Sequence, residues 1–208
     1  TRPGSALVSE EEELERVLPV IEKVAQEIDI PLSIDTYKAK VAKEAVRVGA
    51  HIINDVWGAR QDPDMPATAA ELDVPIILTH NREEGNYDSF MEDVLEDLQK
   101  SLTLVEYEGF PREKVILDPG VGFAKNVDEN LTILKDIHKI VELGFPVLLG
   151  TSRKSFIGHV LDLPVEERLE GSLATVAYGV SKGCHIVRVH DVKETVRVCK
   201  MMDAIVRI

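Results

Sequence analysis

Two cationic side chains interrupt an apolar stretch, "IVRVHDV", at residues 186–192. Neighbours in a strand alternate between its faces, so Val187 and Val189 share one face while Arg188 and His190 share the other. A charged Arg in apolar surroundings costs free energy unless it is paired or reaches water. The pattern therefore predicts that Arg188 and His190 stand in a wet mouth that accepts an anion, because Arg can bind a phosphate through two parallel hydrogen bonds.

Acidic and amide side chains end three other apolar runs. Asp35 ends "PLSID", Asp118 follows "VIL" in "VILDPG", and Asn54 lies in "HIIND". Each aspartate alone could simply cap a helix or a turn. Together the three suit a flat heterocycle with amino and lactam groups, because a carboxylate can accept two parallel N–H bonds from such a ring.

A basic, hydroxyl-rich loop, "GTSRKS", occupies residues 150–155. It is either a solvated turn or a loop that binds an anion or a ring oxygen. Lys154 could bond a carbonyl oxygen of the heterocycle, and Arg2 is a further candidate for the anion. No His, Cys, Asp or Glu cluster has metal-ligand spacing. Any metal is therefore expected to be held by the substrate or by residues outside this chain.

Six apolar runs alternate with amphipathic stretches, which predicts parallel strands joined by right-handed helical crossovers. Ser9 followed by Glu12 is typical of a capping box that starts a helix. Glycines are expected to end helices at positions 49, 109, 144 and 183. The six expected strands lie within residues 31–35, 51–55, 75–81, 115–120, 146–155 and 185–191.

Polar side chains at all six strand ends favour a barrel over an open sheet. An open sheet binds its ligand only at a switch point, whereas a (β/α)8 barrel gathers the carboxyl end of every strand at one face. The expected fold class is therefore an α/β TIM barrel, with residues 1–208 as one domain. A complete barrel has eight strands and about 250 residues, so we expect an N-terminally incomplete barrel of about six units. The natural protein would then carry about fifty more residues upstream.

Composition narrows the partners. The formal net charge of −13 argues against nucleic acid and against an anionic membrane. No apolar run reaches the roughly 18 residues of a membrane span. Two isolated cysteines, Cys184 and Cys199, suggest free thiols in a reducing compartment. We therefore expect a cytoplasmic protein that acts on a small molecule.

Seven motifs carry a resemblance to the dihydropteroate synthases: "TRPG", "SIDTYKA", "IINDVWG", "DPGVGFAK", "SRKSFIG", "LPVEERLEGS" and "IVRVHDV". They occur in that family's order over the whole chain. The resemblance implies a TIM barrel that joins 6-hydroxymethyl-7,8-dihydropterin diphosphate to p-aminobenzoate and releases diphosphate. It also implies Mg²⁺ as cofactor, a homodimer and an enzyme of the class that sulfonamides target.

The resemblance also implies site residues. The pterin set would be Asp35, Asn54, Asp118 and Lys154, with Arg188 lying against the ring. The diphosphate and p-aminobenzoate would be met by Thr1, Arg2, Pro3, Phe123, Ser155 and His190, with Lys154 also bordering the aminobenzoate. The catalytic residues would be Lys154, Arg188 and His190.

Two departures from the family pattern accompany the resemblance. Thr79 stands where the family commonly has Met before "HN", and the family's first two strands, with a loop Asn that helps hold Mg²⁺, are not in this sequence. A chain that truly starts at Thr1 is expected to be inactive. Two other functions stay open: a pterin-binding methyltransferase domain, and a non-catalytic truncated barrel. The first would not need the anion residues of "TRPG" and "SRKS".

Overall fold

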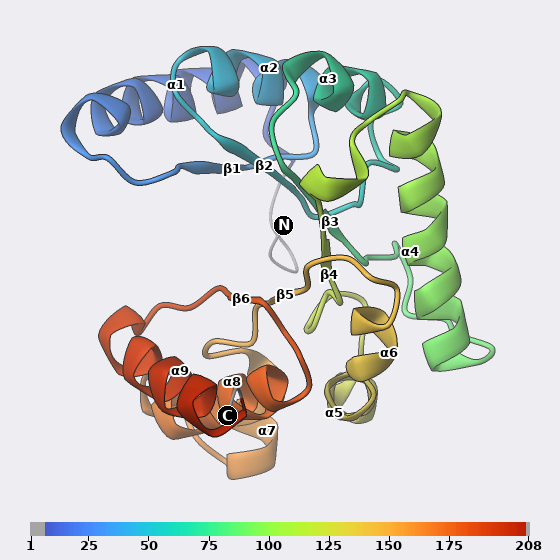
Figure 1. Cartoon of the computed structure of the whole chain (residues 1–208), viewed down its shortest axis with the longest axis vertical. Coiled ribbons are helices and arrows are strands. Elements are labelled where there is room, and N and C mark those ends of the chain that lie inside the picture. The colour runs from blue at the N-terminus through green and yellow to red at the C-terminus, as the bar shows by residue number, and fades with distance from the viewer. Residues whose placement is uncertain (1–6, 207–208) are drawn as a thin grey trace. The chain divides into compact units, whose positions relative to one another are not determined.

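The computed structural model describes residues 7–206. Its contacts divide the chain into two compact units (Figure 1). The first unit runs to Thr79 and includes Asp97–Ile116, and the second comprises His80–Glu96 and the residues from Leu117 onward. Within the described part of the chain, no helix is both long and apolar enough to cross a bilayer. The single domain expected from the sequence stays a prediction.

The first unit is built on parallel strands. β1 (Ser33–Asp35) pairs with β2 (Ile52–Asp55), which pairs with β3 (Ile76–Thr79), and β4 (Val115–Asp118) follows in the sheet order. The register sets Asp35 directly opposite Asn54. Ile53, Ile76 and Leu78 are fully buried, as expected for strands covered by helices.

Helices α1 (Glu10–Glu27), α2 (Ala39–Arg47) and α3 (Met65–Leu72) lie side by side along these strands (Figure 1). Ser9 caps α1 as the sequence predicts, since its side chain accepts from the Glu12 N–H. Pro19 lies inside that helix without ending it. A fourth helix, α4 (Phe90–Tyr107), begins in the second unit and ends in the first. A short 3-10 turn, η1 (Arg112–Lys114), precedes β4.

The second unit continues the alternation. After β4 come α5 (Val127–Lys135), α6 (His138–Val141), β5 (Leu148–Leu149), α7 (Ser155–Leu161), the 3-10 turn η2 (Val165–Glu167), α8 (Leu169–Ser181), β6 (Ile186–Val187) and α9 (Val192–Val206). β5 and β6 pair in parallel, and a parallel bridge joins Leu117 to Val147. Helices α8 and α9 pack closely together (Figure 1).

All six predicted strands are present, and each predicted glycine stop has a positive φ. Two turns with the sequence Gly-x-His, at residues 49–51 and 183–185, make the same hydrogen bond. His51 accepts the Leu32 N–H through Nδ1 at 3.1 Å, and His185 accepts the Val147 N–H in the same way at 3.2 Å. These histidines, for which the sequence suggests no function, fasten the start of one strand to the start of its neighbour.

Candidate active site

Asp118 ends β4 inside a tight turn of the second unit. It is only 8% exposed, and its Oδ1 accepts the Gly120 N–H at 2.7 Å. Its carbonyl accepts the His80 N–H at 2.9 Å. Gly120 has φ +67°, and a Cβ there would lie 1.8 Å from the His80 carbonyl oxygen. Only glycine therefore allows the backbone to turn so closely beside the carboxylate.

Three cations surround the Asp118 carboxylate. Burial raises the pKa of Asp118, while Lys154, then Lys125 and Arg188, act to lower that pKa. Burial lowers the pKa of Lys154, and the Asp118 charge opposes that shift. The second unit thus brings together Asp118, Lys154 and Arg188, three of the residues predicted for pterin recognition.

Lys154 lies against the loop that follows Asp118. Its Nζ donates to the Val121 carbonyl and lies 4.8 Å from the centre of the Phe123 ring. A Cβ at Gly122 would come within 2.9 Å of the Lys154 side chain. Lys154 and Phe123, which the resemblance assigns to the p-aminobenzoate, therefore meet on one side of this loop.

His190 and Arg188 follow β6, which is shorter than the stretch that the sequence predicts. The strand ends at Val187 because only the Arg188 N–H continues the ladder, bonding the Leu149 carbonyl at 2.9 Å. The backbone N–H of His190 turns instead to the Ser152 hydroxyl, and its Nδ1 lies 2.9 Å from the same oxygen. Both predicted anion-binding side chains are exposed.

The loop at Ser152–Ser155 is fastened from α8 and from the start of α9. Arg153 has φ +56°, and both of its backbone groups are bonded: its N–H to the Ser172 hydroxyl at 2.9 Å and its carbonyl to Arg168 at 3.1 Å. Its guanidinium forms an ion pair with Asp191 at 2.5 Å. Arg153 is therefore a structural cation, while Ser155, the first residue of α7, is exposed.

The first unit holds the other two predicted pterin residues together. The Asn54 side-chain amide donates to Asp35 Oδ1 across the β1–β2 register. Asn54 is 5% exposed, and its Oδ1 accepts no hydrogen bond from residues 7–206. A buried acceptor of this kind costs free energy when it is unsatisfied. Asn54 Oδ1 is therefore suited to an N–H group of a ligand.

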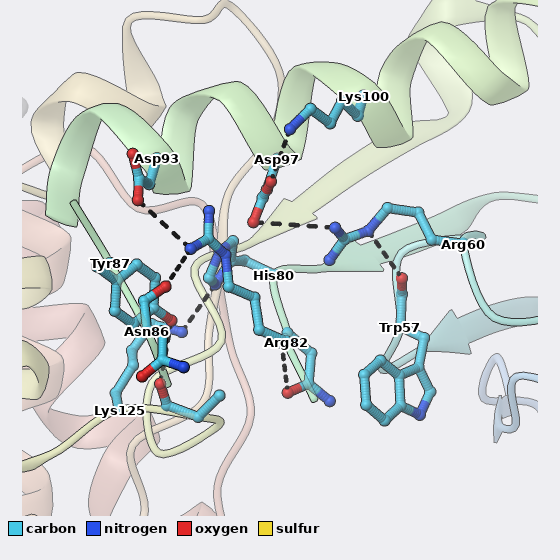
Figure 2. Close-up of polar contacts among 12 residues, drawn as sticks. Trp57, Arg60, His80, Arg82, Asn86, Tyr87, Asp93, Asp97, Lys100 and Lys125 are labelled. Atoms are coloured by element: carbon cyan, nitrogen blue, oxygen red, sulfur yellow. Dashed lines mark hydrogen bonds and ion pairs between the residues drawn. The ribbon is translucent and has the colours of Figure 1, made fainter. Parts of the chain in front are cut away.

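Asp55, next along the chain, has a structural task. It is fully buried and accepts the Trp57 and Ala59 N–H groups at 2.8 and 2.9 Å, which closes the turn after β2. Burial raises the pKa of Asp55 to about 6 against the lowering effect of these two bonds. Arg60 continues this network: its Nε donates to the Trp57 carbonyl at 3.4 Å, and its guanidinium forms an ion pair with Asp97 at 3.8 Å (Figure 2).

Sequence reasoning missed Lys125 and gave His80 no role. Lys125 Nζ lies 2.8 Å from His80 Nδ1 beside the turn after Asp118 (Figure 2). The available signal was a lysine placed directly after the apolar letters "VGFA" in "DPGVGFAK". A lysine that follows such a run has either to reach water or to find buried acceptors.

The structure does not describe every predicted site residue. Thr1, Arg2 and Pro3 lie outside the described residues. Between residues 7 and 206, no group of three or more His, Cys, Asp or Glu side chains could hold a metal ion. That any metal is held by the substrate or by residues outside this chain stays a prediction. The roles of the individual site residues stay predictions.

The chain is similar to known proteins over most of its length. The profile of the family described as "Pterin binding enzyme" matches residues 1–190. The dihydropteroate synthase of Bacillus subtilis is 56% identical over 204 residues, which cover 98% of this chain and 72% of that protein. The dihydropteroate synthase of Clostridium beijerinckii is 52% identical over 208 residues, covering 100% of this chain and 77% of that protein.

Solved structures agree with the sequence relatives. The dihydropteroate synthase of Clostridium difficile, crystallised in the presence of pteroic acid, has a TM-score of 0.98 and 46% identity, covering 100% of this chain and 80% of that one. A Yersinia pestis dihydropteroate synthase with a pterin–sulfa conjugate has a TM-score of 0.93 and 38% identity, covering 98% and 79%. These matches confirm the predicted α/β barrel fold class. The chain belongs to the pterin-binding enzyme family and, within it, to the dihydropteroate synthases.

Proposed function

We propose that Asp118, Lys154, Arg188 and His190 carry the dihydropteroate synthase reaction in this chain. In that reaction the amine of p-aminobenzoate displaces diphosphate from 6-hydroxymethyl-7,8-dihydropterin diphosphate. One C–O bond breaks, one C–N bond forms, the amine loses a proton, and 7,8-dihydropteroate and diphosphate leave. The site must therefore favour both a positive pterin ring and a departing anion.

The observation that carries this proposal is a buried carboxylate, Asp118, among cations from three separate chain segments. The carboxylate can accept two N–H bonds from the aminopyrimidinone edge of a pterin. Its negative charge also favours positive charge that develops on the ring as the C–O bond lengthens. Within the first unit, Asn54 Oδ1 is a separate buried acceptor suited to an N–H group of a ligand.

The cations would serve the leaving group. Arg188 presents a guanidinium suited to phosphate oxygens. The Ser152 contact occupies His190 Nδ1, so Nε2 is the nitrogen that would donate to the diphosphate. Lys154, against the Phe123 ring, would meet a ring oxygen of the pterin and border the p-aminobenzoate. Sulfonamides, which accompany a related synthase in the crystal, would compete for that aminobenzoate position.

Three features stay proposals. Diphosphate oxygens are good Mg²⁺ ligands, so a magnesium ion would be held chiefly by the substrate, and we assign no step to it. A cytoplasmic location is supported by two free thiols, Cys184 and Cys199. Burial raises the pKa of the Cys184 thiol to about 12, so this thiol is unreactive at neutral pH. A homodimer is expected from the family resemblance.

Calorimetry on the natural protein tests the proposal. We expect 6-hydroxymethyl-7,8-dihydropterin to bind, and we expect inorganic diphosphate to strengthen its binding, because the occupied anion site adds favourable contacts. Arg188→Ala should remove this enhancement. An absence of pterin binding would exclude the function. Binding that diphosphate leaves unchanged would favour a pterin-binding methyltransferase instead.

A further inference from the structure

Lys125 is a partly buried cation whose three N–H groups all have an acceptor. Its Nζ lies 2.8 Å from His80 Nδ1 (Figure 2). The same atom lies 2.9 Å from the Phe123 carbonyl and 3.0 Å from the Gly120 carbonyl. An ammonium group has three donors and no acceptor. The contacts therefore use its full hydrogen-bonding capacity, with two acceptors in the loop that follows Asp118 and the third on His80.

These contacts close the loop that follows Asp118. Gly120 and Phe123 bound the turn itself, since the Phe123 N–H bonds the Gly120 carbonyl at 2.9 Å. His80 is fully buried, follows β3 and donates its backbone N–H to the Asp118 carbonyl. Lys125 thus links the far end of the loop to the residue that fixes its beginning.

A tyrosine braces the same loop from the segment after β3. The Tyr87 hydroxyl donates to the Ala124 carbonyl at 3.0 Å, and its ring lies 6.1 Å from the His80 ring. A Cβ at Gly85 would approach the Ala124 carbonyl to 2.9 Å. The Lys125 ammonium is therefore held at a fixed place and cannot swing freely into water.

Charged groups from several elements face Lys125. Burial lowers the pKa of Lys125 to about 7; Asp118 and Glu129 oppose this shift, and Lys154 and Arg82 reinforce it. Arg82 is itself paired with Asp93 on α4 at 3.4 Å. Lys154 and Arg188 add further positive charge around Asp118. Lys125 is thus a cation near Asp118 whose charge is expected to change around neutral pH.

We propose that Lys125 is a positioning residue for the reaction: its ammonium fixes the loop from Gly120 to Phe123 and keeps Asp118 a carboxylate that accepts the pterin N–H groups. Lys125 acts through Asp118 and the loop and need not touch the substrate. The inference rests on the proposed function. It differs from a purely structural role because it couples pterin affinity to the charge on Lys125.

Two substitutions separate these roles. Lys125→Met keeps the apolar length and removes the charge, whereas Lys125→Arg keeps a positive charge at every accessible pH. Lys139→Met is the control, because Lys139 is a half-exposed lysine of the same unit whose partner is Asp136. The affinity for 6-hydroxymethyl-7,8-dihydropterin is measured by calorimetry in the natural protein on both sides of pH 7, together with the melting temperature.

Below pH 7, Lys125→Met should weaken pterin binding about tenfold, the effect of losing one interaction with a charged group. Without the ammonium, Asp118 holds its proton more tightly, so affinity should be lost at a higher pH as the solution is acidified. Above about pH 7 wild-type Lys125 is itself largely neutral, and the difference should narrow. Lys125→Arg should retain affinity, and Lys139→Met should match the wild type.

Other outcomes would contradict a positioning role for Lys125. If Lys125→Met has the wild-type affinity and pH profile, Lys125 has no positioning role. If its affinity falls equally at every pH, with a lower melting temperature and no recovery in Lys125→Arg, its role is structural only. A wild type that binds no pterin removes the proposed function and this inference with it.

A second measurement decides the case if Lys125→Met does not fold. The Lys125 side-chain carbon next to Nζ can be titrated by NMR in the wild type and in Asp118→Asn. The pKa of Lys125 should fall in Asp118→Asn, because the carboxylate that raises it has been removed. An identical titration in the two proteins would show that the groups are not coupled and would overturn the inference.

Discussion

At the scale of single residues, each polar strand end has a different task. The Asp55 carboxylate accepts two backbone N–H groups of its own turn. The Oδ1 atom of the neighbouring Asn54 accepts no hydrogen bond from residues 7–206. Arg153 is paired with Asp191, whereas the neighbouring Lys154 lies beside Asp118. The residue types alone do not separate these roles, because the separation depends on which backbone groups lie within reach.

Asn54→Ala is predicted to lower affinity for 6-hydroxymethyl-7,8-dihydropterin about tenfold, the loss of one hydrogen bond from a buried acceptor. The substitution also removes the bond from the Asn54 amide to Asp35, so the melting temperature should fall somewhat, and the affinities are compared well below the melting temperature of both proteins. Asn86→Ala is the control, since Asn86 is an exposed amide of a surface loop. Equal affinity in Asn54→Ala and the wild type would remove Asn54 from the pterin set.

Residue chemistry predicted Asp118, Lys154 and Arg188 as neighbours, because the carboxyl ends of parallel strands share one edge. Their mutual electrostatic influence in the second unit agrees with that prediction. Lys125 escaped the same reasoning. Its position depends on the left-handed turn at Gly120 and on the His80 ring, which is 45 positions away in sequence.

At the scale of elements, α8 supports the loop after β5. Ser172 accepts the Arg153 N–H, and Arg168 donates to the Arg153 carbonyl, so the left-handed residue before Lys154 is fixed at both ends. The Arg168 guanidinium also fills the space above Gly158, where a Cβ would approach it to 2.1 Å. The letters "ERLEGS" at residues 167–172 thus form a support for the basic loop.

Ser172→Ala is predicted to lower the free energy of unfolding by about 1 kcal/mol, since the Arg153 N–H loses its acceptor. The rate constant kcat should also fall, because Lys154 is then held less firmly. Ser181→Ala, on the same helix but at an exposed hydroxyl, should leave kcat unchanged. If Ser172→Ala loses stability without any change in kcat or KM, α8 does not position the loop for chemistry.

The six strands were predictable at this scale, because apolar runs and glycine stops reflect local geometry. The ends of β5 and β6 were not. Both strands are only two residues long, and the sequence predicts longer ones. Beyond Arg188, the His190 N–H bonds the Ser152 hydroxyl instead of the neighbouring strand, and no local pattern reveals this contact.

At the scale of the whole molecule, the charge balance fits the proposed chemistry. The net charge is −13, yet the second unit collects Lys125, Lys154 and Arg188 around one buried carboxylate. The chain as a whole is acidic, yet three of its cations lie at one place. This arrangement suits a small anionic substrate better than a polyanionic surface. Overall composition predicted a small-molecule partner, and we expect its ring to bind at the turn after β4.

The most direct test compares dihydropteroate formation by the natural protein and by Asp118→Asn. An Asn oxygen can still accept the Gly120 N–H, so the fold should be kept while the charged acceptor for the ring is lost. Asp162→Asn is the control, because Asp162 is exposed and has a left-handed φ that Asn adopts equally well. The account predicts that kcat/KM falls about a hundredfold or more in Asp118→Asn, the loss of two charge-assisted hydrogen bonds, and is unchanged in Asp162→Asn. Wild-type turnover in Asp118→Asn, or no dihydropteroate from the unaltered protein, would contradict it.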